Sequence, residues 1–186
     1  RRSAQTAINE ILESLVRLMA PVLSFTADEI WQRMKGKERS SSVHTELFVP
    51  VNPAYQDPEL AGRWEDLIAF RKEVTKALEL ARKDKVIGHP LDASVTIGLS
   101  PDLMKKIAPY REQLRSIFIV SLVDIKGLDE LDKSLESETL PGLRIKISPS
   151  TDSKCERCWV HDPSVGDDTS HPTICKRCIQ ALAEME

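Results

Sequence analysis

The chain has 186 residues, of which 41% are hydrophobic and 30% charged, and its formal net charge is −3. This composition is ordinary for a globular protein, and the small negative charge excludes a broadly basic nucleic-acid binder, so any contact with nucleic acid must be local. No apolar run reaches the roughly 18 residues that a membrane span needs, and no contact with a membrane is expected.

Two amphipathic helices are predicted at the N-terminal end. In the first, apolar residues recur at steps of three and four between Ile8 and Met19, and Pro21 ends or bends the helix. The second is predicted to begin at Thr26, because Thr26 and Glu29 form a capping-box pattern that would satisfy free backbone N–H groups.

A polar connection over residues 36–56 leads to a third and longer helix. Asp57 is its expected N-cap and Pro58 its first residue, and the helix is predicted to end near Lys85 with Gly88 as the closing residue. Its apolar stripe is expected to face a core. The members of the stripe are Leu60, Leu67, Val74 and Leu78, flanked by Trp64, Phe70 and Ala81.

Basic side chains lie on the face of the third helix opposite this stripe. At 100° per residue, that face carries Lys72, Lys76, Glu79 and Lys83. It is either a solvated helix surface or a stripe that faces the phosphate groups of a nucleic acid. Arg71, at the margin of the apolar stripe, is expected to pair with a buried carboxylate.

The pattern beyond residue 90 predicts a small α/β unit at residues 91–150. Strands are expected where apolar and polar residues alternate or β-branched residues gather, and residues 127–139 are expected to form a loop or short helix. The predicted elements are strands at 93–99, 117–125 and 143–147, and a helix from 101 to about 115 that is broken near Pro109.

Four cysteines near the end of the sequence form two pairs, Cys155-x2-Cys158 and Cys175-x2-Cys178. A two-residue gap lets one tight turn direct both sulfur atoms at the same ion, so this spacing predicts one structural zinc ion with four thiolate ligands. Redox and disulfide roles are the alternatives, but so few cysteines in a chain of this length are not typical of a disulfide scaffold. A reducing, cytoplasmic compartment is therefore expected.

Two residues beside the first cysteine pair are candidates for binding nucleic acid. Trp159 is expected either to pack beneath the zinc site or to stack on an unpaired base, and Arg157 would then contact a phosphate or a base edge. His161 and His171 could replace a cysteine as zinc ligands, but four cysteines already fill the shell, so both are expected to be surface residues.

The sequence contains no motif that indicates catalysis. It has no G-x-x-x-x-G-K-[ST] phosphate-binding loop and no G-x-S-x-G nucleophile motif. Ile87-Gly88-His89 follows a long helix rather than a strand, which is typical of a helix end and not of a nucleotide-binding site. No catalytic residue is therefore predicted in this chain.

Several segments together resemble the class I aminoacyl-tRNA synthetases. Arg17–Trp31 resembles the first helical hairpin of their anticodon-binding domain, Phe70–Arg82 resembles the long helix that follows, and Ile87–Ala93 is similar to the turn before the next strand. Lys154–Trp159, together with Ile174–Cys178, narrows the resemblance to bacterial isoleucyl-tRNA synthetases, whose chain ends in a four-cysteine zinc module.

This resemblance implies a mainly α fold in three parts. A helical-bundle anticodon-binding domain is expected at 1–90, a small α/β junction subdomain at 91–150 and a zinc module at 151–186. The chain would be a C-terminal portion that binds the anticodon stem-loop of isoleucine tRNA as a monomer. ATP and isoleucine would bind to the catalytic domain, which is missing here along with the editing domain. The expected tRNA-binding residues are Arg157, Trp159, Lys72, Lys76 and Lys83.

Two other functions are compatible with the zinc motif. A DNA-repair glycosylase carries a related zinc module on a helical domain and would bind duplex DNA through a basic hairpin. Here the loop between the cysteine pairs contains Asp162, Asp167 and Asp168, which a phosphate backbone would repel. A zinc-stabilised protein-interaction module would explain the cysteines but not the helical motifs.

Overall fold

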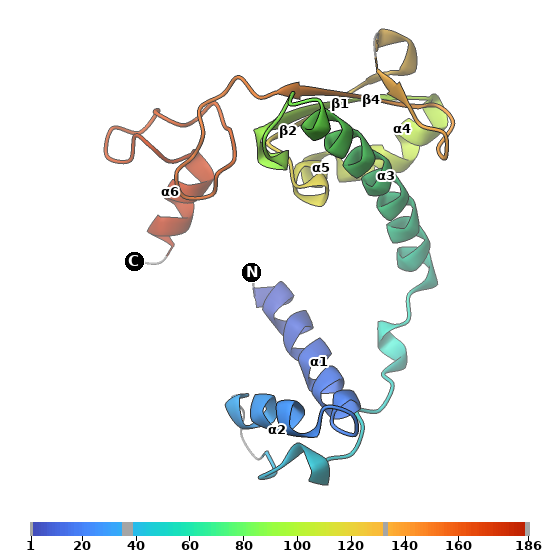
Figure 1. Ribbon diagram of the computed structural model, residues 1–186, viewed down its shortest axis with the longest axis vertical. Coiled ribbons are helices and arrows are strands. Elements are labelled where there is room, and N and C mark those ends of the chain that lie inside the picture. Colours follow the sequence, from blue (N-terminus) through green and yellow to red (C-terminus); the bar gives the residue numbers. More distant parts are fainter. Residues whose placement is uncertain (1, 35–38, 132–133, 185–186) are drawn as a thin grey trace. The chain divides into compact units, whose positions relative to one another are not determined.

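The computed structural model describes residues 2–34, 39–131 and 134–184. The chain forms two compact units, Arg1–Asp57 and Pro58–Glu186, and helix is the most abundant regular structure in it (Figure 1). Among the described residues, no helix has the length and apolar character needed to cross a membrane. The predicted division at residues 90 and 150 stays a prediction.

The first unit is built on α1 (Arg2–Met19) and α2 (Ser24–Arg33), followed by the 3-10 turns η1 (Val43–Thr45) and η2 (Pro53–Tyr55). Its small core gathers around the indole of Trp31, which is 2% exposed. The guanidinium groups of Arg17 and Arg39 lie 4.8 Å and 4.7 Å from the centroid of this ring, and both bond to the carboxylate of Glu13. Two cation–π contacts, whose charges the Glu13 carboxylate pairs, therefore complete this small core.

The predicted capping box of the second helix is wrong. α2 begins at Ser24, so Thr26 lies inside its first turn, and Leu23 takes the N-cap position with no side-chain hydrogen bond. The reason is the turn that ends α1, in which the Leu23 N–H donates to the Met19 carbonyl at 2.8 Å and returns the chain to helix before Thr26.

The second unit contains a four-stranded mixed sheet in the order β2-β1-β4-β3. β1 and β2 are parallel, because the chain crosses between them through two short helices, whereas β4 is antiparallel to β1 and to β3. The strands are β1 (Ala93–Leu99), β2 (Leu122–Gly127), β3 (Leu135–Glu136) and β4 (Leu143–Pro149). The helices are α3 (Pro58–Lys83), α4 (Pro101–Ile107), α5 (Arg111–Phe118) and α6 (Lys176–Ala183), with 3-10 turns η3 (Pro90–Asp92), η4 (Ala108–Tyr110) and η5 (Leu128–Glu130).

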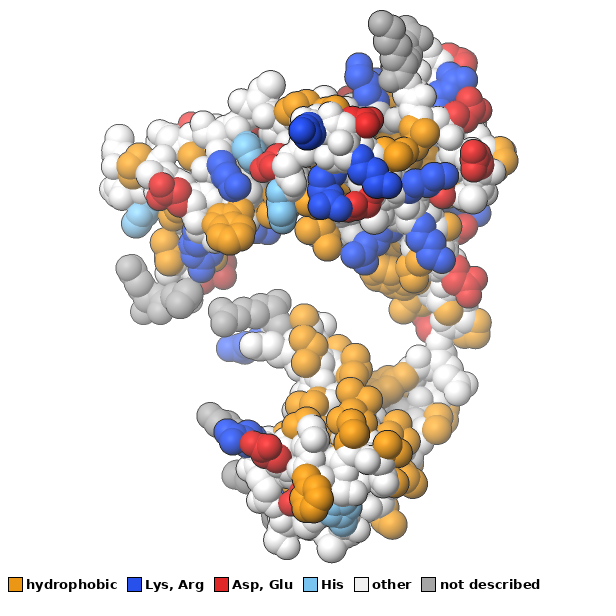
Figure 2. Space-filling model, viewed as in Figure 1, with side chains coloured by type: hydrophobic (Ala, Val, Ile, Leu, Met, Phe, Trp, Pro, Cys, Tyr) orange, Lys and Arg blue, Asp and Glu red, His pale blue; other side chains and the backbone are white. Residues whose placement is uncertain are grey.

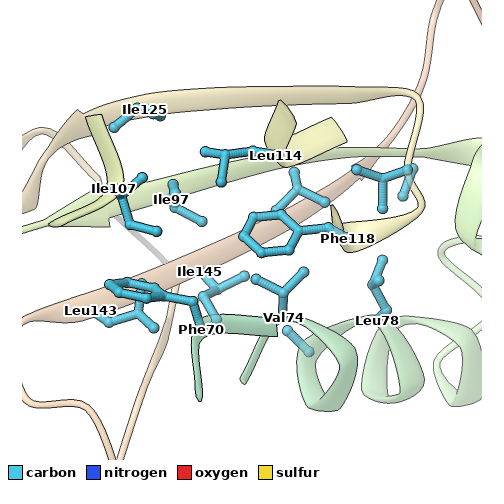
Figure 3. Packing of buried hydrophobic residues seen from close by; sticks show 14 of the residues in the cluster. Phe70, Val74, Leu78, Ile97, Ile107, Leu114, Phe118, Ile125, Leu143 and Ile145 are labelled. Carbon is cyan, nitrogen blue, oxygen red and sulfur yellow. The ribbon is translucent and has the colours of Figure 1, made fainter. Parts of the chain in front are cut away.

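One hydrophobic core lies between the sheet and helices α3, α4 and α5, which Figure 1 shows on the same side of the strands. Figure 3 shows side chains of α3 and α5 pointing toward those of the strands. In β1, Val95, Ile97 and Leu99 are at most 1% exposed, while the intervening Ser94 and Thr96 are only half-buried. This alternation is the period of a strand with one covered face.

The apolar stripe of the third helix is confirmed from Leu67 onward. Leu67, Phe70 and Val74 are at most 2% exposed in the core, but Leu60 and Trp64 are 41% and 46% exposed. The N-terminal part of α3 therefore carries apolar side chains that the sheet does not cover.

The end of this helix differs from the prediction. α3 ends at Lys83, and it is Lys85, with φ 58°, that takes the left-handed conformation expected of Gly88. The Val86 N–H donates to the Ala81 carbonyl at 2.9 Å and the Lys85 N–H to the Arg82 carbonyl at 3.1 Å. These two bonds form a Schellman motif, so the helix is already closed before Gly88.

The predicted strand 117–125 is partly wrong, because α5 continues through Phe118 and β2 begins only at Leu122. Phe118 enters the core from the helix and is 3% exposed. Ile119 then takes a left-handed φ of 58°, and the Val120 N–H donates to the Arg115 carbonyl at 3.1 Å to close the helix.

Candidate zinc site and nucleic-acid interface

Four cysteine sulfur atoms converge near the C-terminal end, all within 4.8 Å of one another. The Sγ atoms of Cys155 and Cys178 are 3.8 Å apart, and those of Cys158 and Cys175 are 3.7 Å apart. Ligands about 2.3 Å from a tetrahedral zinc ion would be about 3.8 Å from each other, whereas a disulfide requires about 2.05 Å. The cluster fits one structural zinc ion, and the disulfide alternative is not supported because all four thiols are free.

Two local structures bring these sulfur atoms together. The first is a tight turn in which the Cys155 N–H donates to the Val160 carbonyl at 2.9 Å and the Trp159 N–H to the Cys155 carbonyl at 2.8 Å. The second is the start of α6, where Cys175 is the N-cap and Cys178 lies in the first turn. Both cysteines of each pair therefore face the same point, as the two-residue spacing predicted.

The surroundings of the thiols favour a cation between them. Burial acts to raise the pKa of Cys155, but the backbone N–H groups of Cys175, Cys158 and Arg157 outweigh it and lower the pKa to about 6. Burial, together with the neighbouring thiols, raises the pKa of Cys175 to about 12. Packed thiols cannot all ionise unless a positive charge compensates them, and a divalent ion supplies that charge. The donor set therefore fits zinc.

The turn around the first cysteine pair presents Trp159 to solvent. Its side chain is 61% exposed, its backbone is left-handed with φ 64°, and Lys154 Nζ lies 6.0 Å from the ring centroid. The apolar groups packed against the buried cysteines are those of Cys158, Val165 and Ile174 instead. Of the two predicted roles of Trp159, packing beneath the zinc site is therefore not observed. Arg157 is exposed on the same turn.

The histidines take no part in the metal cluster of the described residues. His171 is exposed, as predicted. The prediction that His161 is also a surface residue is wrong, because its side chain is only 17% exposed and its Nδ1 lies 2.7 Å from the Asp152 carbonyl oxygen. His161 lies instead where the zinc module meets the sheet.

The three predicted lysines of the third helix are all exposed on α3. Figure 2 shows Lys and Arg side chains gathered over this helix. Lys76 Nζ lies 3.7 Å from Glu138 Oε2, an exposed pair that contributes little, and no ion pair of the described residues includes Lys72 or Lys83. The lysines therefore form an open basic surface.

The expected pairing of Arg71 with a buried carboxylate is wrong. Arg71 is exposed, and no ion pair within the described ranges includes it. The buried carboxylate of α3 is Glu73, which accepts hydrogen bonds from Ser137 Oγ at 2.7 Å and Thr139 Oγ1 at 2.8 Å. Hydroxyl groups of the segment before β4 thus satisfy it in place of an arginine.

Contacts that seat the zinc module on the sheet were missed by sequence reasoning. The His161 N–H donates to Ser121 Oγ at 2.7 Å, and Arg115 Nη2 lies 3.1 Å from Asp162 Oδ2. The partners are 40 and 47 residues apart in the chain, so no local pattern could have revealed them.

Two family models match this chain. One is described as the anticodon-binding domain of tRNA ligase and matches residues 1–97, and the other is described as a zinc finger found in FPG and IleRS and matches residues 152–181. Because the second description covers two kinds of protein, the zinc finger alone does not separate the predicted functions. The first match favours tRNA over DNA.

The whole chain is also similar to isoleucine–tRNA ligases. That of Syntrophotalea carbinolica is 48% identical over 99% of this chain and 20% of the relative. Those of Geobacter sulfurreducens and Moorella thermoacetica are 47% and 39% identical over 98% and 100% of this chain, again 20% of each relative. The chain spans about a fifth of the length of these curated relatives. The resemblance seen in the sequence is confirmed, and the chain belongs to the family of anticodon-binding domains of tRNA ligases, with a zinc finger of the kind found in FPG and IleRS.

Proposed function

We propose that this chain is the tRNA-binding part of an isoleucine–tRNA ligase and that it recognises the anticodon stem-loop of isoleucine tRNA. The observation that carries the proposal is the combination, in one chain, of the anticodon-binding match with a zinc module that exposes Trp159. The whole enzyme would join isoleucine to its tRNA with ATP, and both would bind outside this chain. This part would contribute by holding the tRNA so that its acceptor end reaches the active site.

The zinc module would read the unpaired anticodon loop. Stacking on the face of an aromatic ring suits unpaired bases, and Trp159 offers such a face beside the exposed guanidinium of Arg157. One zinc ion bound by Cys155, Cys158, Cys175 and Cys178 would keep this surface rigid. On α3, Lys72, Lys76 and Lys83 would contact phosphate groups of the stem.

The three predicted parts, 1–90, 91–150 and 151–186, would act as anticodon-binding bundle, junction and zinc module. The bundle is supported by the apolar face of α1, on which Ile8 and Ile11 are each 64% exposed. Figure 2 shows hydrophobic side chains gathered over this helix, and a hollow of about 820 Å³ lies between it and residues 49–55. A helix with so apolar an outer face requires cover, which further helices of the intact protein would supply.

The cellular setting follows from the metal site. Four reduced thiols that bind zinc require a reducing compartment such as the cytoplasm. We expect the protein to act there as a monomer, with one zinc ion in each chain.

A binding titration at one stated salt concentration tests the proposal. The probes are an isoleucine tRNA transcript, the same transcript with an altered anticodon, and a DNA duplex. We expect the chain to bind the native anticodon more tightly than the altered one. We also expect Trp159→Ala to weaken the binding of isoleucine tRNA by about 1–3 kcal/mol, because one base would no longer be stacked. Leu122→Ala is the matched control, because Leu122 is 48% exposed on β2 and is not among the proposed tRNA-binding residues.

Three results would count against this reading. Equal, weak binding to all three probes would contradict anticodon recognition by this chain. Tightest binding to the duplex would favour the DNA-repair function. Unchanged tRNA affinity in Trp159→Ala, with the native preference intact, would remove Trp159 from the interface.

A further inference from the structure

The zinc module and the sheet have separate hydrophobic clusters. The cluster around Cys155, Cys175 and Cys178 shares no member with the core between the sheet and its helices. Figure 1 shows one stretch of chain that leaves β4 and enters the module. A module attached in this way would rotate about that stretch unless other contacts hold it. Such contacts exist, and we call them the joint: Asp92, Arg115 and Ser121 on the sheet side, and Lys154, His161 and Asp162 on the module side.

Ser121 forms the buried centre of the joint. Its side chain is 1% exposed, and its hydroxyl donates to the Leu91 carbonyl while it accepts the His161 N–H at 2.7 Å. The hydroxyl therefore connects the turn before β1 to the backbone of the zinc module. Because both bonds are shielded from water, their geometry is strongly specified.

Asp92 holds the module from the turn before β1. Its Oδ2 accepts the His89 N–H at 2.8 Å, which fixes the carboxylate. Its Oδ1 lies 3.4 Å from His161 Nε2 and 3.8 Å from Lys154 Nζ. The other ring nitrogen of His161 hydrogen-bonds the Asp152 carbonyl oxygen at 2.7 Å, so the imidazole lies between this carbonyl and the Asp92 carboxylate, to which the buried Nε2 makes no hydrogen bond.

Asp162 holds the module from a different element. Its Oδ1 accepts hydrogen bonds from the Ser164 hydroxyl at 2.6 Å and the Ser164 N–H at 3.1 Å, which directs Oδ2 to Arg115 on α5 at 3.1 Å. His161 and Asp162 are neighbours in the chain, yet they are held by η3 and α5 respectively. Rotation of the module would therefore break at least one of the two contacts.

We propose that the joint positions the zinc module for binding of tRNA, with Asp92 and Asp162 as the positioning residues. The inference rests on the proposed function. Trp159 lies close along the chain to both Lys154 and His161, so a fixed joint also fixes its ring relative to the lysines of α3. A tRNA that contacts both surfaces then binds a preorganised site, and less conformational entropy of the module is lost on binding.

The test is the double variant Asp92→Asn/Asp162→Asn, in which the amide oxygens can still accept the local backbone N–H groups. Removing two negative charges would strengthen binding of a polyanion if charge alone mattered. We expect the opposite, about tenfold weaker binding of isoleucine tRNA, because a mobile module must be ordered on binding. Asp102→Asn is the matched control, since the Asp102 side chain is 93% exposed and remote from the joint.

A second measurement reports the joint without tRNA. Residual dipolar couplings of backbone amides should fit one alignment for the sheet and the module in the unaltered chain and two in the double variant, with one zinc ion per chain in both. One alignment in the double variant, or tRNA affinity that rises or is unchanged, would overturn the inference. An unaltered chain that fails to bind tRNA would contradict the proposed function itself. The residual dipolar couplings would then still show whether the joint fixes the module on the sheet.

Discussion

The sheet and the zinc module of the second unit are stabilised in different ways. The sheet buries a continuous apolar layer in which Phe70, Ile97 and Leu143 are at most 1% exposed. Among the described residues, the module buries three of its cysteines and Val160, and the partly buried side chains against these cysteines are those of Cys158, Val165 and Ile174. A segment this small cannot gain enough from burial and requires a metal. The stability of the sheet should therefore depend on the volume of its buried side chains, and the stability of the module on its bound zinc.

The largest effect is expected from removal of the zinc ion. Structural zinc contributes about 10–16 kcal/mol to the folding of small modules, so Cys158→Ser or a chelator should unfold residues 151–184 and leave the sheet intact. Zinc content and amide chemical shifts measure the two parts separately. Ser153→Ala, a change beside the site that removes no ligand, is the control. A variant that keeps a full equivalent of zinc would contradict the four-thiolate site.

The corresponding change in the sheet is Phe70→Ala, which removes a large side chain from the core shown in Figure 3. Phe70 is 1% exposed, and truncation of a buried phenylalanine costs about 3–5 kcal/mol, because a cavity remains. Urea denaturation of the sheet measures the loss, and Phe25→Ala should change it by less than about 0.5 kcal/mol. Under native conditions the variant should still bind one zinc ion. Loss of zinc from it would show that the two regions do not fold independently.

A smaller effect is expected at Glu73, the buried carboxylate of α3. Hydrogen bonds from Ser137 and Thr139 hold the pKa of Glu73 below its ordinary value. A carboxyl group with a lowered pKa stabilises the folded chain at pH values above its pKa in the unfolded chain. This stabilisation is lost as the pH falls through its pKa in the folded chain. Glu73→Gln should therefore cost about 1–2 kcal/mol at pH 7, and this cost should shrink as the pH is lowered below the ordinary glutamate pKa and through the lowered one. A cost that stays constant over the whole acid titration would contradict the charged hydrogen bonds.

The elements with strong local signals were predictable from the sequence. The long helix, the strands at β1 and β4 and the break at Pro109 follow from periodicity and proline chemistry. The cysteine spacing likewise gave the zinc site, because a two-residue gap has a simple geometric meaning. These features depend on residues that are close in sequence.

Features decided by distant partners were not predictable. The run Ile117–Val120 has the composition of a strand, but Phe118 enters the core from a helix, and short apolar runs do not distinguish the two. The exposure of Trp159 depends on whether Val165 and Ile174 fill the space beneath the zinc site. The joint depends on pairs such as Ser121 with His161, which only the folded chain brings together.

The smallest effect is expected when the backbone strain of one residue is relieved in each of the two regions. Ile119 on the sheet side and Trp159 in the module both have left-handed backbones, with φ 58° and 64°, and both are more than half exposed at 51% and 61%. A side chain in this conformation destabilises the folded chain by about 1–2 kcal/mol. Substitution by glycine removes this steric cost, but glycine loses more backbone entropy on folding, so only part of the energy is regained. Ile119→Gly should therefore stabilise the sheet by about 1 kcal/mol in urea denaturation and leave tRNA affinity unchanged. Trp159→Gly should relieve the same strain but weaken tRNA binding, because the ring is lost with it. If Ile119→Gly weakened tRNA binding as well, strain on the sheet side would also serve recognition, and the division between a structural sheet and a recognising module would fail.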